Sequence, residues 1–217
     1  MARPLWQRLA LMVLIGGAAL LSLLFLWILL LIPLTPGIND LRQARAAQPT
    51  VIVAADGKEL TSFEEGFHEH VPLKKISPHV IKALIATEDH RFYEHNGIDF
   101  KRTAAALAYS ASGDPQGGST LTQQLARNMF PKEIGRSRNI SRKLKEIVTA
   151  IKIESAMTKD EILEAYLNTV PFLYNAFGIE MAARTYFGKS AAKLDILESA
   201  TLVGMLKGTN YYNPVSN

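Results

Sequence analysis

The sequence contains no cysteine and very little net charge. The absence of cysteine excludes a disulfide framework, zinc sites built from thiolates and catalysis by a thiol nucleophile. Of the 24 Lys and Arg residues only Arg3 and Arg8 precede Pro33, and all 20 Asp and Glu residues follow it, so the remainder has 22 cations against 20 anions. So small an excess argues against a nucleic-acid partner. The 217 residues leave room for one domain and one additional element.

Charge is absent altogether from residues 9–32, LALMVLIGGAALLSLLFLWILLLI. This run would form a helix of about 36 Å, enough to cross a hydrocarbon core about 30 Å thick. A cleaved signal peptide has a shorter apolar region, and the small-residue candidate Ala44-Arg45-Ala46 lies well beyond the run. A helix buried in a soluble core would need a second all-apolar segment, which the sequence lacks. We therefore predict a transmembrane anchor. Arg3 and Arg8 favour a cytoplasmic location for residues 1–8.

The rest of the sequence predicts a small β element followed by helices. Residues 33–57 are interpreted as a polar stalk and a β hairpin turned at Asp56-Gly57, and residues 58–217 as one mostly α domain. Helix starts are indicated by Ser77-Pro78, Asp99, Thr120-x-x-Gln123 and Thr158-x-x-Glu161, the last two as capping boxes. A long helix carries Ile140, Leu144, Ile147, Val148 and Ile151 on one face, and two more helices are expected near 176–187 and 194–206, closed by Gly188 and Gly208.

Glu88 occupies a position that the helical pattern reserves for an apolar side chain. Ile81, Leu84 and Ile85 mark a buried stripe on the helix that starts at Pro78, and Glu88 is its next member at i+7. Burial there favours the neutral acid and suits the group to general acid/base chemistry. The alternative is a helix-end glutamate that leaves the core. The following residues 89–97 combine polar, aromatic and glycine residues, which favours a site.

A glycine pair opens the next candidate site. Gly117-Gly118 exposes backbone N–H groups, and Ser119, Thr120 and Gln123 add neutral groups of the kind that bind sugars or phosphates. The segment is not a nucleotide P-loop, because no Gly-Lys-Ser/Thr follows a glycine at the required spacing. Taken alone, the pattern is explained as well by an ordinary helix cap.

Cations and one carboxylate share a flank of the long helix. Arg138, Arg142 and Glu146 are spaced by four, and Lys143 lies three residues before Glu146. Taken alone, the flank is typical of solvated ion pairs. The functional interpretation is a cationic cradle for a phosphate leaving group, in which Glu146 hydrogen-bonds substrate or holds a divalent cation such as Mg²⁺ or Mn²⁺.

The three clusters together suit sugar transfer from a phosphorylated donor. One carboxylate can deprotonate the attacking oxygen while cations neutralise the departing group. A pyrophosphate leaving group needs cations rather than a proton donor. The predicted anchor indicates in addition that the substrate is a lipid at the bilayer surface.

The sequence resembles the peptidoglycan glycosyltransferases of family 51, the glycan-polymerising domain of class A penicillin-binding proteins and of monofunctional transglycosylases. The resemblance covers residues 58–217 and consists of five motifs in the family's order, which makes it highly specific. The motifs are Glu88-Asp-x-x-Phe92-x-x-His95-x-Gly97, Gly117-x-Ser119-Thr-Leu-Thr-Gln123-Gln124-Leu-x-Arg127-Asn128, Arg142-Lys143-x-x-Glu146, Lys159-x-x-Ile162-Leu163-Glu164-x-Tyr166-Leu167-Asn168 and Glu198-Ser-Ala-x-Leu202.

The resemblance implies that Glu88 is the general base for the acceptor 4-hydroxyl and that Glu146 is a second carboxylate that positions substrate or binds a metal. The substrate-binding positions carried over from the motifs and the cationic flank are Asp89, Phe92, His95, Ser119, Thr120, Gln123, Gln124, Arg127, Asn128, Arg138, Arg142 and Lys143. The implied fold is a lysozyme-like helical lobe with a smaller membrane-facing jaw.

The resemblance also implies the partners and the location of the chain. The substrates would be lipid II and the growing glycan strand, with membrane lipid and other cell-wall synthesis proteins as partners. The chain would be a single-pass protein of the bacterial inner membrane with its catalytic domain on the periplasmic side.

The sequence departs from the family pattern at three positions. Arg127 stands where lysine is expected, which keeps the charge but changes its hydrogen-bonding geometry. Leu173 and Asn175 replace expected glycines, which puts the conformation of the loop after Asn168 in doubt. The ending at residues 213–217, without a terminal polar tail or capping helix, favours a domain truncated at its C-terminus.

Other functions fit less of the sequence. A lytic transglycosylase or muramidase-like hydrolase also uses a buried glutamate in a helical domain, but it leaves the cationic flank unexplained. A non-catalytic cell-wall scaffold predicts the loss of a catalytic carboxylate, yet Glu88 and Glu146 are both present.

Two short segments match transpeptidase motifs, Ser190-Ala-Ala-Lys193 and Ser137-Arg-Asn139. They stand in the wrong order, and the Lys-Thr/Ser-Gly that should follow is missing. Ser190 is therefore interpreted as a helix cap.

Overall fold

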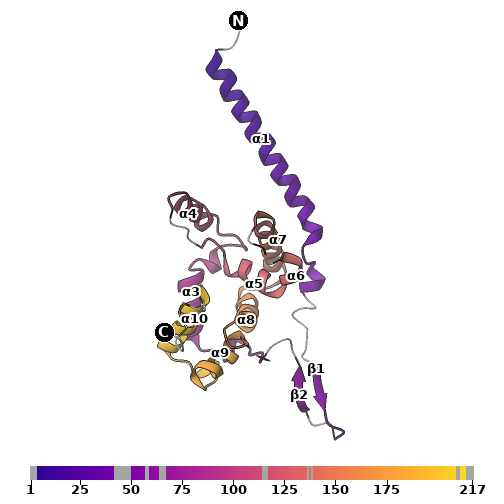
Figure 1. Cartoon of the computed structure of the whole chain (residues 1–217), viewed down its shortest axis with the longest axis vertical. Helices are drawn as coiled ribbons and strands as arrows, with labels where there is room; N and C mark the ends of the chain where they lie inside the picture. The colour runs from indigo at the N-terminus through magenta and orange to yellow at the C-terminus, as the bar shows by residue number, and fades with distance from the viewer. Residues whose placement is uncertain are drawn as a thin grey trace.

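The computed structural model of the chain describes residues 4–41, 50–56, 59–63, 67–113, 117–135, 137, 139–208 and 211–213. Most of the predicted stalk, Gly57 of the hairpin turn and Arg138 of the cationic flank lie outside these residues. In Figure 1 a long N-terminal helix extends away from a body of shorter helices, and a β hairpin stands apart from that body. The mostly α fold class with a small hairpin and an N-terminal apolar helix is confirmed.

The N-terminal helix α1 (Leu5–Leu31) is long and apolar enough to cross a membrane. It continues into a 3-10 turn, η1 (Ile32–Leu34), which begins just before Pro33. Leu31 is the buried residue of α1, while large side chains such as Trp6, Val13 and Leu14 are exposed. Contiguous apolar surface on this scale is typical of a segment that contacts lipid or another protein.

Two small β pairs precede and interrupt the helical body. Strands β1 (Thr50–Val53) and β2 (Glu59–Phe63) pair antiparallel, which confirms the predicted hairpin. The predicted domain boundary at residue 57 falls between these two strands. Strands β3 (Phe67–His68) and β4 (Ala176–Phe177) pair in parallel. This pairing brings the segment that precedes the helices next to the loop after α8.

The helices begin where the sequence places capping residues. Ser77, Asp99 and Thr158 each accept a hydrogen bond from a backbone N–H of the first helical turn, and Thr158 with Glu161 forms the expected capping box. The bounds are α3 (Pro78–Glu88), α4 (Phe100–Ala111), α5 (Leu121–Met129), α6 (Pro131–Ile134), α7 (Ile140–Ala156), α8 (Lys159–Thr169), α9 (Gly178–Phe187) and α10 (Ile196–Lys207), with 3-10 turns η2 (Leu73–Lys75), η3 (Phe92–Glu94) and η4 (Ala191–Lys193).

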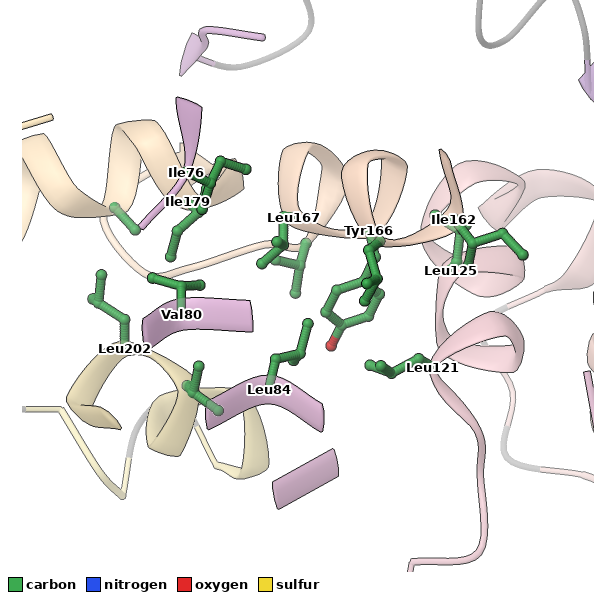
Figure 2. Close-up of a cluster of buried hydrophobic side chains, with 14 of the residues drawn as sticks. Ile76, Val80, Leu84, Leu121, Leu125, Ile162, Tyr166, Leu167, Ile179 and Leu202 are labelled. Carbon is green, nitrogen blue, oxygen red and sulfur yellow. The ribbon is translucent and has the colours of Figure 1, made fainter. Parts of the chain in front are cut away.

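The core surrounds α8, which packs on α5 and α9, while α3 packs on α10. Figure 2 shows Tyr166 extending from α8 toward Leu84 of α3 and Leu121 of α5, all three fully buried. Val80 and Leu202 fill the contact between α3 and α10. Each such side chain contributes roughly 1.5 to 3 kcal/mol by leaving water, so this packing fixes where the ends of α3 and α5 meet.

The long helix α7 buries only part of its predicted apolar stripe. Ile140 and Ile151 of that stripe are 69% and 47% exposed, whereas Val148 is buried. Glu146, Ala150 and Ile153, which lie outside the stripe, are at most 1% exposed, and α7 packs against α5. A carboxylate therefore occupies the interior face of the helix.

The loop after Asn168 keeps a left-handed conformation without the expected glycines. Tyr174 and Asn175 both have φ of 59°, and asparagine tolerates this region better than most side chains. Asn168, just before this loop, ties the end of α8 to the segment that precedes η2, because its side chain bonds both the N–H and the carbonyl of Val71.

Candidate active site

Glu88 is the last residue of α3 and is half-buried. Its Oε2 accepts a hydrogen bond from Gln124 Nε2 of α5 at 2.8 Å, and its backbone carbonyl accepts one from Arg102 Nη1 of α4. The side chains that α3 turns fully to the core are Val80 and Leu84, so Glu88 lies at the edge of that face rather than inside it. Side chains from α5 and α4 thus bind the carboxylate and the backbone carbonyl of Glu88.

Asp89 and His95 fasten the loop after α3 to the start of α5. Asp89 is fully buried, and its Oδ2 accepts a hydrogen bond from Leu121 N at 3.0 Å and lies 3.0 Å from His95 Nε2. Leu121 is the first residue of α5, so the carboxylate sits at the positive end of that helix. Phe92 is also fully buried, with Lys159 Nζ 4.4 Å from the centre of its ring. These groups hold the backbone that follows Glu88.

The carbonyl oxygen of Gly97 joins the same loop to the Gly-Gly helix start. Thr120 Oγ1 donates to it at 2.8 Å and Gln123 Nε2 at 3.1 Å. Thr120 also caps α5 by accepting from the Gln123 backbone N–H at 3.2 Å. The predicted capping box is thus only half formed, because the Gln123 side chain binds Gly97 and Lys143 instead of reaching back to Thr120.

Lys143 of α7 places a cation beside the start of α5. Its Nζ donates to Ser119 Oγ and Gln123 Oε1, both at 2.7 Å, and to Glu146 Oε2 at 3.3 Å. Burial is the main cause that lowers the pKa of Lys143 below its ordinary value; Glu146 opposes this shift, and Arg127 and Arg142 add to it.

Glu146 is buried at the centre of the cationic cluster formed by Arg127, Arg142 and Lys143. Its Oε1 lies 3.3 Å from Arg142 Nε and 3.7 Å from Arg127 Nη1, and its Oε2 faces Lys143. Three cations thus face one carboxylate, whose own side chain is 1% exposed. The surplus of positive charge suits this cluster to bind an anion that carries more than one charge.

The surroundings of Glu146 do not fit a divalent cation. Such an ion needs several oxygen ligands, whereas the charged neighbours of Glu146 are cations. Among the residues that the structure describes, no three His, Cys, Asp or Glu side chains come together as a metal site. No chemical step is therefore derived through Mg²⁺ or Mn²⁺ at Glu146, and a requirement of the reaction for either ion stays a prediction.

Helix α5 connects the two charged parts of the site through adjacent glutamines. Gln123 binds Lys143, and Gln124 binds Glu88. A small open hollow of about 160 Å³ lies beside Gln124, and it is lined by Gln124, Arg127, Asn128, Tyr166, Val170, Pro171 and Leu206. A candidate base and an anion-binding cluster therefore flank one helix.

The predicted site residues fall into two groups. Some are at least partly exposed, namely His95, Ser119, Gln124, Arg127, Asn128, Arg142 and Lys143, whereas others are buried, namely Asp89, Phe92, Thr120 and Gln123. Arg138 lies outside the described residues. Sequence reasoning gave no role to Arg102, Lys159 or Tyr166, because their contacts join helices that are distant in sequence. Lys159 and Tyr166 do stand in the fourth motif, which was the available signal.

Comparison with known proteins assigns a family to most of the chain. Residues 56–217 match the family model described as transglycosylase. The chain is 42% identical over 187 residues to penicillin-binding protein 1A of Escherichia coli, covering 84% of this chain and 21% of that protein. It is 44% identical over 173 residues to penicillin-binding protein 2D of Bacillus subtilis, covering 78% of this chain and 25% of that protein. The chain thus spans a quarter or less of these two relatives.

Proposed function

Because the chain belongs to the transglycosylase family, we propose that it is a peptidoglycan glycosyltransferase that polymerises lipid II. The observation that carries this proposal is the pair of adjacent glutamines on α5. Gln124 holds a carboxylate and Gln123 holds the ammonium of a cationic cluster. A base and a leaving-group cradle on one helix are what transfer of a sugar from a pyrophosphate requires.

Glu88 is the general base of the proposed reaction. It takes the proton of the acceptor 4-hydroxyl as that oxygen attacks the anomeric carbon of the donor. A carbon–oxygen bond forms there while the bond from the same carbon to the pyrophosphate oxygen breaks. Gln124 supports this role, because its N–H group binds Glu88 Oε2 and so fixes the direction of the carboxylate.

The cationic cluster stabilises the departing polyprenyl pyrophosphate. Arg127, Arg142 and Lys143 surround Glu146, which holds them together before the anion arrives. The negative charge that develops on the leaving oxygen is met by charges already in place, so little reorganisation is needed. A leaving pyrophosphate is stable as an anion and requires no proton donor on that side.

The apolar helix α1 supports a membrane location for this reaction. It anchors the domain in the bacterial inner membrane with the catalytic domain on the periplasmic side, where a lipid-linked substrate enters from the bilayer. Lipid II, the growing glycan strand and membrane lipid are the proposed partners, together with other cell-wall synthesis proteins. Dependence of the reaction on Mg²⁺ or Mn²⁺ is a further prediction. Measuring the polymerisation rate before and after addition of a chelator tests it.

The assay is the polymerisation of lipid II by the purified chain in detergent, and the length of the glycan product is the readout. We expect Glu88→Gln to lower the rate at least ~100-fold, because the amide cannot accept the proton, while the melting temperature stays within a few degrees. Glu94→Gln is the matched control, since Glu94 is exposed in the same loop, and it should retain the wild-type rate.

Three outcomes separate the alternatives. Polymerisation by Glu88→Gln at the wild-type rate would show that Glu88 is not the base. Cleavage of preformed glycan without polymerisation would establish the hydrolase. A folded wild-type chain with neither activity would establish the scaffold.

A further inference from the structure

We propose that Tyr166 is a positioning residue that fixes the orientation of the Gln124 amide and, through it, the carboxylate of Glu88. The proposal rests on the proposed function, because it assigns a role to a side chain that supports the base. Tyr166 Oη lies 3.0 Å from Gln124 Oε1, and Gln124 Nε2 lies 2.8 Å from Glu88 Oε2. Three side chains from α8, α5 and α3 thus form one line of hydrogen bonds that ends on the base.

The direction of these hydrogen bonds follows from the chemistry of the groups. An ionised carboxylate only accepts hydrogen bonds, so the end of the Gln124 amide that faces Glu88 must be the NH₂ group. The carbonyl end then faces Tyr166, whose hydroxyl must donate. If the amide turned over, its oxygen would face the carboxylate, and two acceptors would oppose each other.

Tyr166 is suited to hold this orientation because it cannot move or lose its proton easily. Its side chain is fully buried and packs against Leu84 and Leu121, as Figure 2 shows. Burial raises the pKa of the Tyr166 hydroxyl, the charge of Glu88 raises it further, and Arg127 opposes both. The hydroxyl therefore remains a donor throughout the pH range in which the chain is folded and active.

Packing of the Tyr166 ring does not require the hydroxyl, so the two roles can be separated. Phenylalanine keeps the ring among Leu84, Leu121 and their neighbours, but it leaves Gln124 Oε1 without that donor. The amide then keeps only its hydrogen bond to Glu88, so its orientation and that of the carboxylate are held less firmly. The predicted defect is in the chemical step and not in substrate binding.

The test is a double-mutant cycle on the full chain with lipid II in detergent. Tyr166→Phe should lower kcat about three- to tenfold with KM unchanged within about twofold, as expected for the loss of one hydrogen bond that acts in the transition state. Gln124→Ala should lower kcat at least as much. The double variant should match Gln124→Ala within about twofold, because Tyr166 has nothing to act through once Gln124 is gone.

Tyr186→Phe is the matched control, since it removes a tyrosine hydroxyl from α9 and should leave kcat unchanged. A wild-type kcat in Tyr166→Phe, or losses that multiply in the double variant, would overturn the positioning role. A drop in melting temperature without a change in kcat would assign Tyr166 to packing alone. Failure of the wild-type chain to polymerise lipid II would instead contradict the proposed function.

Discussion

Lys143 combines a positive charge with a partly buried position at the start of α5. Its three protons are directed to Ser119, Gln123 and Glu146. Its pKa lies below the ordinary value for lysine, with burial as the main cause. Lys143 therefore loses its proton at a lower pH than an exposed lysine does. The cationic cluster loses part of its positive charge as the pH becomes alkaline.

We therefore expect the polymerisation rate to fall at alkaline pH as Lys143 loses its proton. Lys143→Arg should move this fall to higher pH, because a guanidinium stays charged to above pH ~12. The same variant should lower the maximal rate several-fold, because the planar group cannot reproduce the three contacts of the ammonium. A pH profile of kcat/KM in detergent tests this, and an unchanged alkaline limb in Lys143→Arg would show that Lys143 does not set it.

Gly97 is a position where only glycine fits. Its φ is +85°, and a Cβ there would lie 3.0 Å from the carbonyl carbon and oxygen of Ala150 in α7. Gly97→Ala should therefore destabilise the fold by about 2 to 3 kcal/mol and displace the carbonyl that binds Thr120 and Gln123. Thermal unfolding in detergent measures the change.

Gly113→Ala provides the matched control for Gly97→Ala. Gly113 has a similar φ of +92°, but a Cβ there would meet nothing within 4 Å. Gly113→Ala should therefore lower the free energy of unfolding by only about 1 kcal/mol, the cost of holding alanine at a positive φ. Equal melting temperatures for the two variants would show that the close approach of Gly97 to α7 is unimportant.

At the scale of the helices, the starts are encoded locally and the sequence predicts them well. Ser77, Asp99, Thr120 and Thr158 each cap the helix that follows, because a cap involves residues two or three apart. Ser190 also caps η4 as predicted. Such contacts depend on the chain alone and not on what packs around it.

The face that a helix buries was harder to predict, because it depends on other elements. In the predicted apolar stripe of α7, Val148 is buried but Ile140 and Ile151 are exposed, and Glu146 outside the stripe is buried instead. The hydrogen bond between Tyr166 and Gln124 joins residues 42 positions apart, and nothing in their spacing indicates it. The clusters of the site were predictable from motifs, whereas the contacts that hold them came from the packing of α3, α5, α7 and α8.

At the scale of the whole molecule, Lys152 links the end of the apolar helix to the helical domain, where α1 and η1 also pack against α7. Lys152 of α7 donates to the carbonyl oxygen of Ile32 at 2.9 Å, to that of Pro36 at 3.1 Å and to Thr35 Oγ1 at 2.8 Å. The carbonyl groups at the end of a helix lack partners within it and carry partial negative charge. Lys152 adds hydrogen bonds to carbonyl groups where the chain leaves α1, so it holds the helical domain against the end of α1.

We expect Lys152→Met to loosen this junction without altering the site, which predicts a defect that depends on the membrane. With lipid II in vesicles the rate should fall roughly threefold or more, because the site is no longer held at a fixed place relative to the bilayer. In detergent, where substrate reaches the site from any side, the rate should change by less than about twofold. Lys145→Met is the control, because Lys145 also lies on α7 but donates to Glu133 of α6 instead. Equal losses in vesicles and in detergent would show that Lys152 serves the stability of the domain rather than its placement on the membrane.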